Sequence, residues 1–544
     1  TWVLAGVTAT QGKHQVARPQ VRPDVPPGIT PTRGHGHMST TTGRRHRAAT
    51  AGRRAAAMIA TVGLVLIGAV ATPAAAVESD SAEAEGRVVS GGGTVDLDGI
   101  VSLAPAYSAD PSAPGIVASP LQASVLSTLG IDLGGGVQLF GPNGVIGVGA
   151  LEQYASTSEE DAYAASGAVT QDGSIAVGGT GPQDNAFVDV TELLDTAALS
   201  AITTGLISEL RIELGALSAT AGSVGDDLAT SDYQIADGTL VFTSPVVQNL
   251  TTDLDGALTT LTTTANGITG PTGILGQALP GIATSVVGPL TTALRTVTAG
   301  LVTVSNVAVT AGLTVNLNTA LSAITAAPIT STDSAVTINF ATGEVTVDLA
   351  RLIANSQGGP YDGTLDNLAP NTELLDPSLI QAGLDGAVAT IFDQVPALLV
   401  NSANNTLRSS TMTVRLTANA TVGTPPLAVP LVAVDVLAAG ARASFLGTPG
   451  APAPVLDTSQ TTALGVIPLG TLLTPITSTV VGTLLPAIVT PLSNAITGVG
   501  ITDAAFRPLV VAAGTALQPI TGVIDQILSI TANVQEAGSF TTPA

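Results

Sequence analysis

The chain has 544 residues, with 17 Lys and Arg against 40 Asp and Glu, and a formal net charge of −23. It contains no cysteine, which excludes disulfide bonds and thiolate chemistry, and every histidine and the single lysine lie before residue 77. The rest of the chain therefore cannot build a Ser-His-Asp triad, a Ser-Lys pair or a His-based zinc site. A mean hydropathy of +0.46 favours folded cores over disorder.

The first 76 residues predict a segment that is removed on export. Residues 1–37 precede the first methionine, Met38, and are expected to be an upstream or disordered segment outside the fold. Residues 38–76 have the order of a signal peptide: an arginine-rich start, an apolar stretch at 55–71 and an A-x-A site ending at Ala76. The apolar stretch is short for a membrane span of about 20 residues, so cleavage is favoured over an uncleaved anchor.

Removal of this leader makes the chain strongly acidic. Nine of the 17 basic residues and one of the 40 acidic residues lie in 1–76, which leaves 8 basic and 39 acidic residues and a formal charge of −31. Such a surface repels nucleic acid and anionic lipid, whose phosphates need Lys or Arg. We expect a secreted or cell-surface protein with no nucleic-acid partner and no membrane contact in the mature chain.

The N-terminal part of the mature chain, residues 77–250, is expected to be β-rich. Its short apolar runs alternate in polarity or are bounded by Gly, Asp or Asn, as strands are. One helix is predicted within it, at 190–206, from apolar steps of three and four residues. The runs that predict strands lie at 87–97, 137–140, 167–178 and 240–242.

After residue 250, long charge-poor helical stretches are each followed by an alternating strand. The clearest helix begins at Asp376-Pro377, an N-cap residue followed by proline at the first helical position. Matches between 279–284 and 485–490 favour a repeat, although a composition rich in Ala, Thr, Pro and Leu also produces such matches by chance. We predict three helix-plus-sheet modules, at 251–366, 367–450 and 451–544, with the last one truncated.

One stretch, 458–502, carries no charge and is compatible with either a membrane span or buried helices. Four prolines and many Thr and Ser residues interrupt it. Such residues weaken the prediction of a span. We therefore expect buried helices that cover a sheet.

With His, Lys and Cys absent after residue 76, carboxylates are the only common catalytic side chains that remain numerous. Residue types alone therefore do not exclude glycoside hydrolysis. The aromatic platform that usually holds a sugar is thin, and the acids are expected to serve as surface charge. Calcium was weighed at the acidic pieces 96–99, 253–256 and 159–161, but none completes an EF-hand loop, and turn chemistry explains Asp-Gly equally well. We assign no catalytic, cofactor-binding or metal-ligating residue, no cofactor and no enzymatic activity.

Residues 84–99, AEGRVVSGGGTVDLDG, resemble the start of choice-of-anchor G family surface proteins of high-GC Gram-positive bacteria, and 370–375, PNTELL, resembles another recurrent piece. The resemblance covers most of 80–540. It implies export and attachment to the cell surface through C-terminal anchors that differ between members, and it brings no catalytic residues.

The C-terminus departs from this pattern, because it has no L-P-x-T-G motif, terminal apolar span or basic tail. The third module also lacks the second strand run that the earlier modules have at 335–349 and 430–445. We therefore expect a truncated end, in which the strand at 528–534 has no pairing partner. Self-association through this C-terminal edge follows as a prediction.

Together these patterns predict an elongated α+β protein, with a β-rich N-terminal region followed by repeated modules of aliphatic helices packed on antiparallel sheets. The favoured function is a non-enzymatic exported cell-envelope or surface protein, structural or adhesive, whose partners are envelope components or other surface proteins. The alternative is a secreted glycan-binding or carboxylate-dependent glycan-cleaving protein. A deep cleft with two carboxylates about 5–10 Å apart and a flanking tyrosine would favour this alternative.

Overall fold

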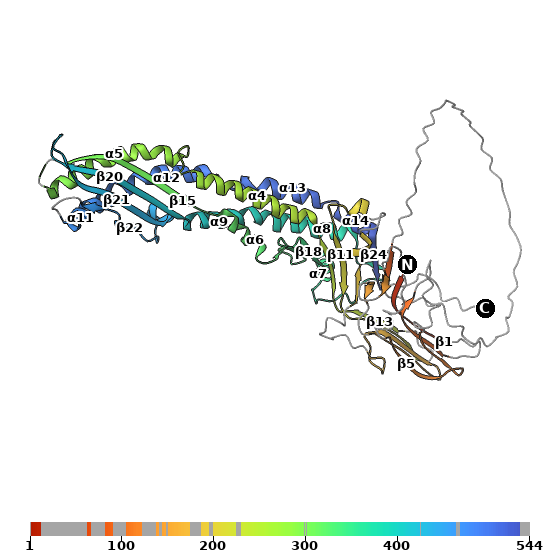
Figure 1. The fold of residues 1–544 in the computed structure, drawn as a ribbon. Helices are drawn as coiled ribbons and strands as arrows, with labels where there is room; N and C mark the ends of the chain where they lie inside the picture. Colours follow the sequence, from red (N-terminus) through yellow and green to blue (C-terminus); the bar gives the residue numbers. More distant parts are fainter. Residues whose placement is uncertain are drawn as a thin grey trace, which may run out of the picture.

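The computed structural model gives an α+β fold, which confirms the predicted class. Figure 1 shows a β-rich base from which one long arm of helices and strands extends. We call this arm, residues 245–325 and 377–527, the stalk. The residues that the structure describes are 2–11, 62–66, 82–90, 105–121, 138–140, 144–147, 151–174, 186–194, 200–224, 230–298, 300, 302–424, 426–463 and 468–533.

The base contains three sheets, whose neighbouring strands are antiparallel except in the pairs β1–β2, β2–β24 and β6–β7. The first sheet has the order β19 (Thr372–Glu373), β24 (Leu528–Ala532), β2 (Val62–Leu66), β1 (Trp2–Gln11), β3 (Ala82–Ser90) and β4 (Ala106–Asp110). The second has the order β13 (Thr230–Ile235), β12 (Leu217–Ser223), β9 (Asp161–Gly167), β8 (Leu151–Ser158) and β5 (Gly115–Leu121). The third has the order β16 (Ile329–Thr330), β17 (Val336–Asn339), β18 (Glu344–Asp348), β14 (Gly238–Thr243), β11 (Glu209–Leu214), β10 (Ala186–Asp189), β7 (Gly144–Gly147) and β6 (Gln138–Phe140).

The first and second sheets pack face to face as a sandwich, in which β3 and β4 lie over β8 and β9. At Gly86 of β3 the two sheets lie very close, because a Cβ built there would lie 2.4 Å from the Tyr154 carbonyl oxygen. On the other face of β3, Glu85 and Arg87 form a buried ion pair at 2.8 Å. Among the side chains that the structure describes, the buried apolar cluster between the two sheets consists of alanines: Ala82, Ala84, Ala106, Ala155, Ala162, Ala164 and Ala221.

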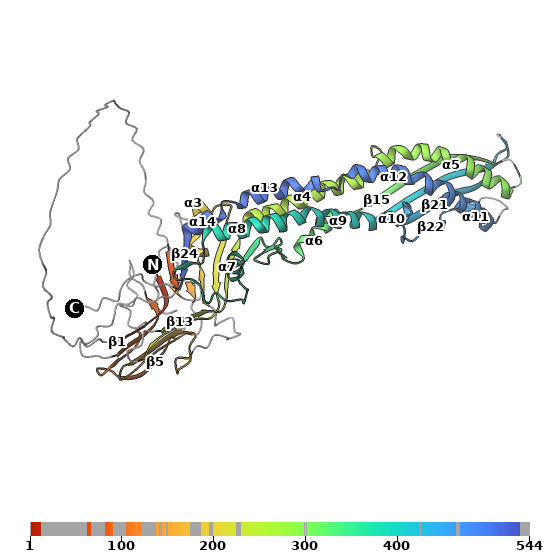
Figure 2. The ribbon, with the colours of Figure 1, turned by 180° about the vertical axis from the view of Figure 1, so that it is seen from behind.

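The stalk is built from three helical stretches that lie side by side (Figures 1 and 2). The first is α4 (Pro245–Gly267) and α5 (Ile274–Thr298). The second is α8 (Pro377–Ala387), a π-helical segment (Val388–Phe392) and α9 (Asp393–Ser409). The third is α11 (Leu469–Thr479), a second π-helical segment (Val480–Leu484), α12 (Leu485–Val499), α13 (Asp503–Leu517) and α14 (Ile520–Ile527).

Threonine is a weak helix former, yet these helices are rich in it. Their threonine hydroxyls donate back to the carbonyl four residues earlier, as Thr260 does to Gly256 and Thr264 does to Thr260 at 3.0 Å. This bond satisfies the hydroxyl without leaving the helix, so the exposed face can be polar without being charged.

The buried stripe of the third stretch recurs every four residues. In an α-helix of 3.6 residues per turn, such a spacing drifts by about 40° at each step. The π-helical segment Val480–Leu484 has more residues per turn and reverses part of this drift, which keeps the stripe facing the core. The stripe consists of Leu472, Ile476, Val480, Leu484, Ile488 and Leu492, each no more than 1% exposed.

The stalk sheet has the order β15 (Val302–Thr314), β20 (Thr411–Val422), β21 (Val429–Ala441) and β22 (Val455–Asp457), and β23 (Thr462–Ala463) also pairs with β21. Helix α5 packs along β15, while α11 and α12 pack on α5. Strands from all three predicted modules thus share one sheet, and helices from all three share one aliphatic core. The boundaries predicted at 251–366, 367–450 and 451–544 therefore do not delimit separate units.

The remaining helices are short: α2 (Thr191–Leu194), α3 (Ser200–Thr203), a 3₁₀ helix (Leu317–Leu321), α6 (Ser322–Thr325), α7 (Leu349–Gln357) and α10 (Arg442–Phe445). The single helix predicted at 190–206 is wrong in extent, because only α2 and α3 are helical among its described residues. The cap at Asp376 is confirmed: its carboxylate accepts hydrogen bonds from the backbone N–H groups of Ser378 and Leu379.

Two strands of the first sheet come from the first 76 residues: β1 from the segment 1–37, predicted to lie outside the fold, and β2 from the predicted signal peptide 38–76. Strand β1 pairs with β3, and β2, within the apolar stretch of the leader, pairs with β1 and β24. The prediction that 1–37 stands apart from the fold is therefore wrong for Trp2–Gln11. Residues 12–61 and 67–81 lie outside the described residues, and the second of these ranges contains the proposed cleavage site at Ala76.

Strand β24 was predicted to have a free edge, and the structure contradicts this. It lies between β19 and β2, and its alternate residues Leu528, Ile530 and Ala532 are fully buried. The unpaired N–H and C=O groups of an edge strand can pair with any compatible strand. In this chain, β2 of the leader pairs with β24. Self-association of the whole chain is therefore not explained by the C-terminal strand.

Within the part of the chain that the structure describes, three helical stretches are long and apolar enough, by length and composition, to cross a membrane: Ile274–Thr298, Pro377–Ser409 and Leu469–Ile527. In the structure, each of them buries one face against the other stalk helices or the stalk sheet. The uncharged stretch 458–502 forms the end of the stalk sheet and the helices α11 and α12, so a helical packing layer accounts for its composition.

Candidate functional site

One hollow, of about 360 Å³, lies in the stalk between α5 and β15. It opens where the pairing of β15 with β20 shifts register between Ser305 and Ala308, with Asn306 in the left-handed conformation (φ 52°). No ionisable side chain lines the hollow, so it offers apolar contact and backbone polar groups but no acid or base. Its lining residues are Leu279, Pro280, Ala283, Thr284, Val287, Val304, Ser305, Asn306, Val307, Ala308 and Val309.

A group of interacting ionisable side chains, in which the pKa values of Tyr233, Tyr361 and Asp366 are raised, lies elsewhere, where the loop at 361–368 joins the second and third sheets. We call this group the polar seam. Sequence reasoning did not single it out, because the residues come from three separate segments of ordinary loop composition. Its members are Asp232, Tyr233, Asp348, Arg351, Tyr361, Asp362 and Asp366.

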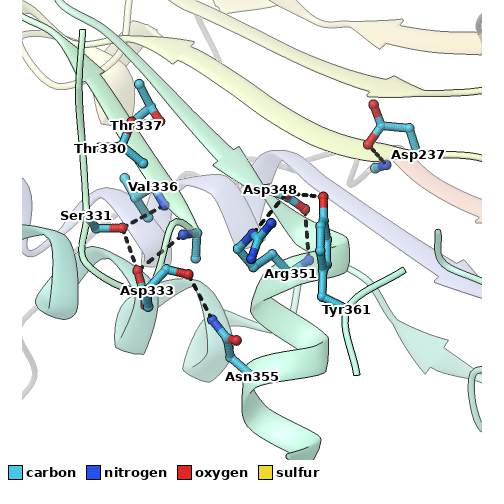
Figure 3. Close-up of polar contacts among 12 residues, drawn as sticks. Asp237, Thr330, Ser331, Asp333, Val336, Thr337, Asp348, Arg351, Asn355 and Tyr361 are labelled. Carbon is cyan, nitrogen blue, oxygen red and sulfur yellow. Dashed lines mark hydrogen bonds and ion pairs between the residues drawn. The ribbon is translucent and has the colours of Figure 1, made fainter. Parts of the chain in front are cut away.

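At one end of the seam, Asp348 caps helix α7 and holds Tyr361 (Figure 3). Its carboxylate accepts a hydrogen bond from the Arg351 backbone N–H at 2.8 Å and another from the Tyr361 hydroxyl at 2.7 Å. The Arg351 guanidinium lies 3.6 Å from the centre of the Tyr361 ring, within the range of a cation–π contact. The hydrogen bond to the Asp348 carboxylate raises the pKa of Tyr361, because ionised phenol could not donate it.

At the other end, Tyr233 and Asp366 tie the loop to β13. The Leu368 backbone N–H donates to the Tyr233 hydroxyl oxygen at 2.6 Å, and the Ile235 backbone N–H donates to the Asp366 carboxylate at 2.7 Å. Burial raises the pKa of Tyr233 to about 12. Burial, and then the negative charges of Asp362 and Asp232, raise the pKa of Asp366.

A second group in Figure 3 closes the turn between β16 and β17. The Ser331 hydroxyl donates to the Asp333 carboxylate and accepts from the Val336 backbone N–H, while the Ala335 N–H donates to Asp333. The Asn355 side chain of α7 reaches the Asp333 carbonyl oxygen at 3.5 Å. These bonds fix a hairpin against a helix and leave no group aimed at a ligand.

The carboxylates of the seam are already engaged in holding backbone. Asp348 caps a helix, Asp366 accepts from a strand, and Asp362 accepts from both the N–H and the hydroxyl of Thr364 at 3.0 Å. A glycosidase needs two carboxylates that face one cleft, one of them free to take or give a proton. The seam does not offer this arrangement, and the hollow in the stalk contains no carboxylate.

The acidic pieces weighed for calcium have other roles where they can be seen. Asp253–Gly256 lies inside helix α4, so turn chemistry is the wrong explanation there, and Asp255 accepts from the Asn318 amide at 2.7 Å. Glu159–Asp161 forms the tight turn between β8 and β9. Asp96–Gly99 lies outside the described residues, among which no three His, Cys, Asp or Glu side chains are grouped to hold a metal ion.

Residues 84–544 match one family model, described as a domain of unknown function, DUF8394. The chain belongs to the DUF8394 family. The matched region of this DUF8394 chain begins within β3, so it contains the stalk and most of the base but neither β1 nor β2. Neither a curated protein nor a solved structure matches the chain.

Proposed function

We propose that this DUF8394 chain is an exported, non-enzymatic protein of the cell envelope or cell surface, in which the stalk acts as a structural spacer that carries an adhesive end. The observation that carries the proposal is the form of the stalk. Its third helical stretch, Leu469–Ile527, has 59 residues. At about 1.5 Å per residue, these span up to about 90 Å.

The core of the stalk supports a spacer role. One continuous set of buried Leu, Ile and Val side chains connects the helices to the stalk sheet and to the base. Close packing of this kind resists bending, because each helix would have to withdraw its stripe from its neighbours. An enzyme of similar size would instead be expected to concentrate polar groups around a cleft.

The far end of the stalk supports an adhesive role. Val302 pairs with Val422, so the turn between α5 and β15 and the turn between β20 and β21 lie at the same end, away from the base (Figure 1). The second turn presents Leu427 and Val429, which are 82% and 60% exposed. Apolar side chains displayed on an otherwise acidic protein are typical of a contact surface.

Export is supported by the leader order, the acidic mature composition and the resemblance to choice-of-anchor G surface proteins. The region that matches the family model begins after Ala76, at residue 84. N-terminal sequencing of protein recovered from the cell surface or medium should begin at Val77. Recovery only in membranes with the leader intact would contradict export with cleavage.

Small-angle scattering tests the spacer. A compact protein of this length has a radius of gyration of about 24 Å. The purified chain should exceed this value clearly and give a maximum dimension of about 90 Å or more. A compact profile would remove the basis of the proposed function.

The absence of nucleophilic catalysis has its own test. The mature chain has no His, Lys or Cys to activate a serine. We expect no labelling by an active-site probe for serine hydrolases. Labelling that is lost when one serine is replaced would overturn the non-enzymatic assignment.

A further inference from the structure

Strand β5 forms the outer edge of the second sheet, at the end of the base away from the stalk (Figure 1). It pairs with β8 along seven residues, from Gly115 opposite Thr157 to Leu121 opposite Leu151. No described strand pairs with its other edge. Its side chains Ile116 and Val117 are 71% and 38% exposed.

The other outer strands of the described sheets are protected against pairing. Natural proteins do this with charge, shortness, bulges or a covering element. On the opposite edge of the same sheet, β13 carries Asp232 and is covered by the loop at 361–368. Strand β15 is bulged and packs against α5, and both β4 and β22 end in aspartate. The remaining outer strands are short: β16 and β19 have two residues each, and β6 has three.

Among the described residues, strand β5 has none of these devices along most of its length. Its sequence, GIVASPL, contains no ionisable side chain, although the whole chain carries a net charge of −23. Pro120 lacks a backbone N–H and limits pairing near the end of the strand, and the Gly115 carbonyl oxygen already accepts a hydrogen bond from the Ser108 hydroxyl at 2.7 Å. The residues between them, 116–119, are the part of the edge that can pair with a partner.

We propose that β5 pairs with β5 of a second copy of this chain, antiparallel across a twofold axis, so that two five-stranded sheets join into one. Two copies of so acidic a protein repel each other wherever carboxylates meet. The uncharged edge is the place where backbone hydrogen bonds can form without bringing like charges opposite each other. Self-complementary contact across a twofold axis is also the commonest way in which soluble proteins dimerise.

The strand register makes the contact specific. With the axis at Val117, the two Val117 side chains lie opposite each other on the face shared with Ala155, and Ile116 lies opposite the partner's Ala118 on the outer face. Pairs of β-branched and small aliphatic residues suit such positions. Pairing of β5 with β13 of another copy would instead be head to tail, would bring Asp232 into the contact and would extend into filaments.

This inference goes beyond the proposed function and does not depend on export or on the stalk. A dimer would, however, present two stalk ends. Once one stalk end is bound, the second is held near the same surface at a high effective concentration, so two weak contacts give one stronger attachment.

Charge exchange across the predicted register provides the test. In the full chain, Ile116→Lys/Ala118→Lys places lysine opposite lysine and should weaken the dimer at least about tenfold, as measured by sedimentation equilibrium. Ile116→Glu/Ala118→Glu should also be monomeric alone. An equimolar mixture of the two variants should restore dimers, because each lysine then faces a glutamate.

Val224→Lys is the matched control, because Val224 is 67% exposed and follows β12 outside the proposed contact. This variant should dimerise like the parent chain, and all variants should share the parent's unfolding midpoint. A parent chain that is monomeric at every concentration would overturn the proposal. Dimers of the double lysine variant that are as stable as those of the parent chain would overturn it as well, and so would an equimolar mixture of the lysine and glutamate variants that stays monomeric. Loss of dimers in Leu427→Lys, with dimers retained in the double lysine variant, would assign the contact to the stalk end.

Discussion

The sandwich and the stalk use one composition to build two kinds of core. Between the first and second sheets, the buried apolar cluster of described side chains consists of seven alanines, and Gly86 lies close to the opposite backbone. In the stalk, stripes of Leu, Ile and Val from three helical stretches close on each other and on a sheet. Small side chains bring backbones together, whereas large ones keep them apart and bury more apolar area.

This difference changes what each region depends on. Burial of a leucine side chain stabilises a fold by about 1.5–3 kcal/mol, whereas an alanine contributes only about one methyl group. The sandwich therefore relies more on backbone pairing and on the closeness of its sheets. The stalk relies on the volume of its side chains. Each of the following predictions separates these two dependences.

Deletion of residues 1–76, which reproduces leader cleavage, should have the largest effect, and mainly in the sandwich. It removes β1 and β2, which lie between β24 and β3 in the first sheet. Amides of β3 and β24 should lose protection in hydrogen exchange because their partners are gone, while those of α9 and β20 should keep it. Unchanged protection at β3 would show that the leader strands contribute nothing to the sandwich.

Leu290→Ala should destabilise the stalk by about 2–5 kcal/mol, because Leu290 of α5 is fully buried and its removal leaves a cavity. The change is measured by urea unfolding, followed by a probe in the stalk. Val511→Ala, at an apolar position of α13 that is 58% exposed, is the matched control and should cost little. Equal losses at the two positions would contradict a core that depends on side-chain volume.

Gly86→Ala tests the sandwich in the opposite sense, by adding volume. The new Cβ would lie 2.4 Å from the Tyr154 carbonyl oxygen and 2.5 Å from that of Ala165. Because both contacts are backbone atoms, the sheets must separate, at a cost of about 1–3 kcal/mol. Gly256→Ala in α4 is the control: its new Cβ meets nothing within 4 Å, and the variant should be more stable by up to about 1 kcal/mol. A lower free energy of unfolding for Gly256→Ala, or an unchanged one for Gly86→Ala, would contradict this comparison.

The helices could be predicted from the sequence because their signals are local. The cap at Asp376 and the stripe from Leu472 to Leu492 are patterns within one segment, and the structure places both as helices. The pairing of β15 with β20 joins residues about a hundred positions apart, and the packing of α13 on α4 joins residues more than two hundred positions apart. Nothing in either segment specifies its partner, so the three predicted modules were separated where the fold interleaves them.

The polar seam was missed for the same reason. Tyr233 and Asp366 are ordinary residues in their own segments, and only the fold brings the loop at 361–368 onto β13. Their altered pKa values come from burial, which a sequence does not show. The edge at β5 is a partial exception, since an uncharged run in an acidic chain was visible, but its place at the rim of a sheet was not.

The smallest expected effect concerns the junction between sandwich and third sheet, and it appears only at high pH. Burial raises the pKa of Tyr233 to about 12 in the folded chain, against about 10 in the unfolded chain. The contribution of the neutral phenol is therefore fully present below about pH 10 and is lost as the pH rises toward 12. Tyr233→Phe removes the ionisation, so the free energy of unfolding of this variant should fall less between these pH values than that of the parent chain, as measured by urea unfolding.

Tyr163→Phe, in β9 within the sandwich, is the matched control. Burial also raises the pKa of Tyr163, but its hydroxyl donates to the Gly173 carbonyl oxygen and does not hold the loop at 361–368. As the pH rises, the amides of Leu365 and Leu368 should lose protection from hydrogen exchange before those of the sandwich strands. Loss of protection at the same pH in both places would show that the polar seam is not the weaker junction.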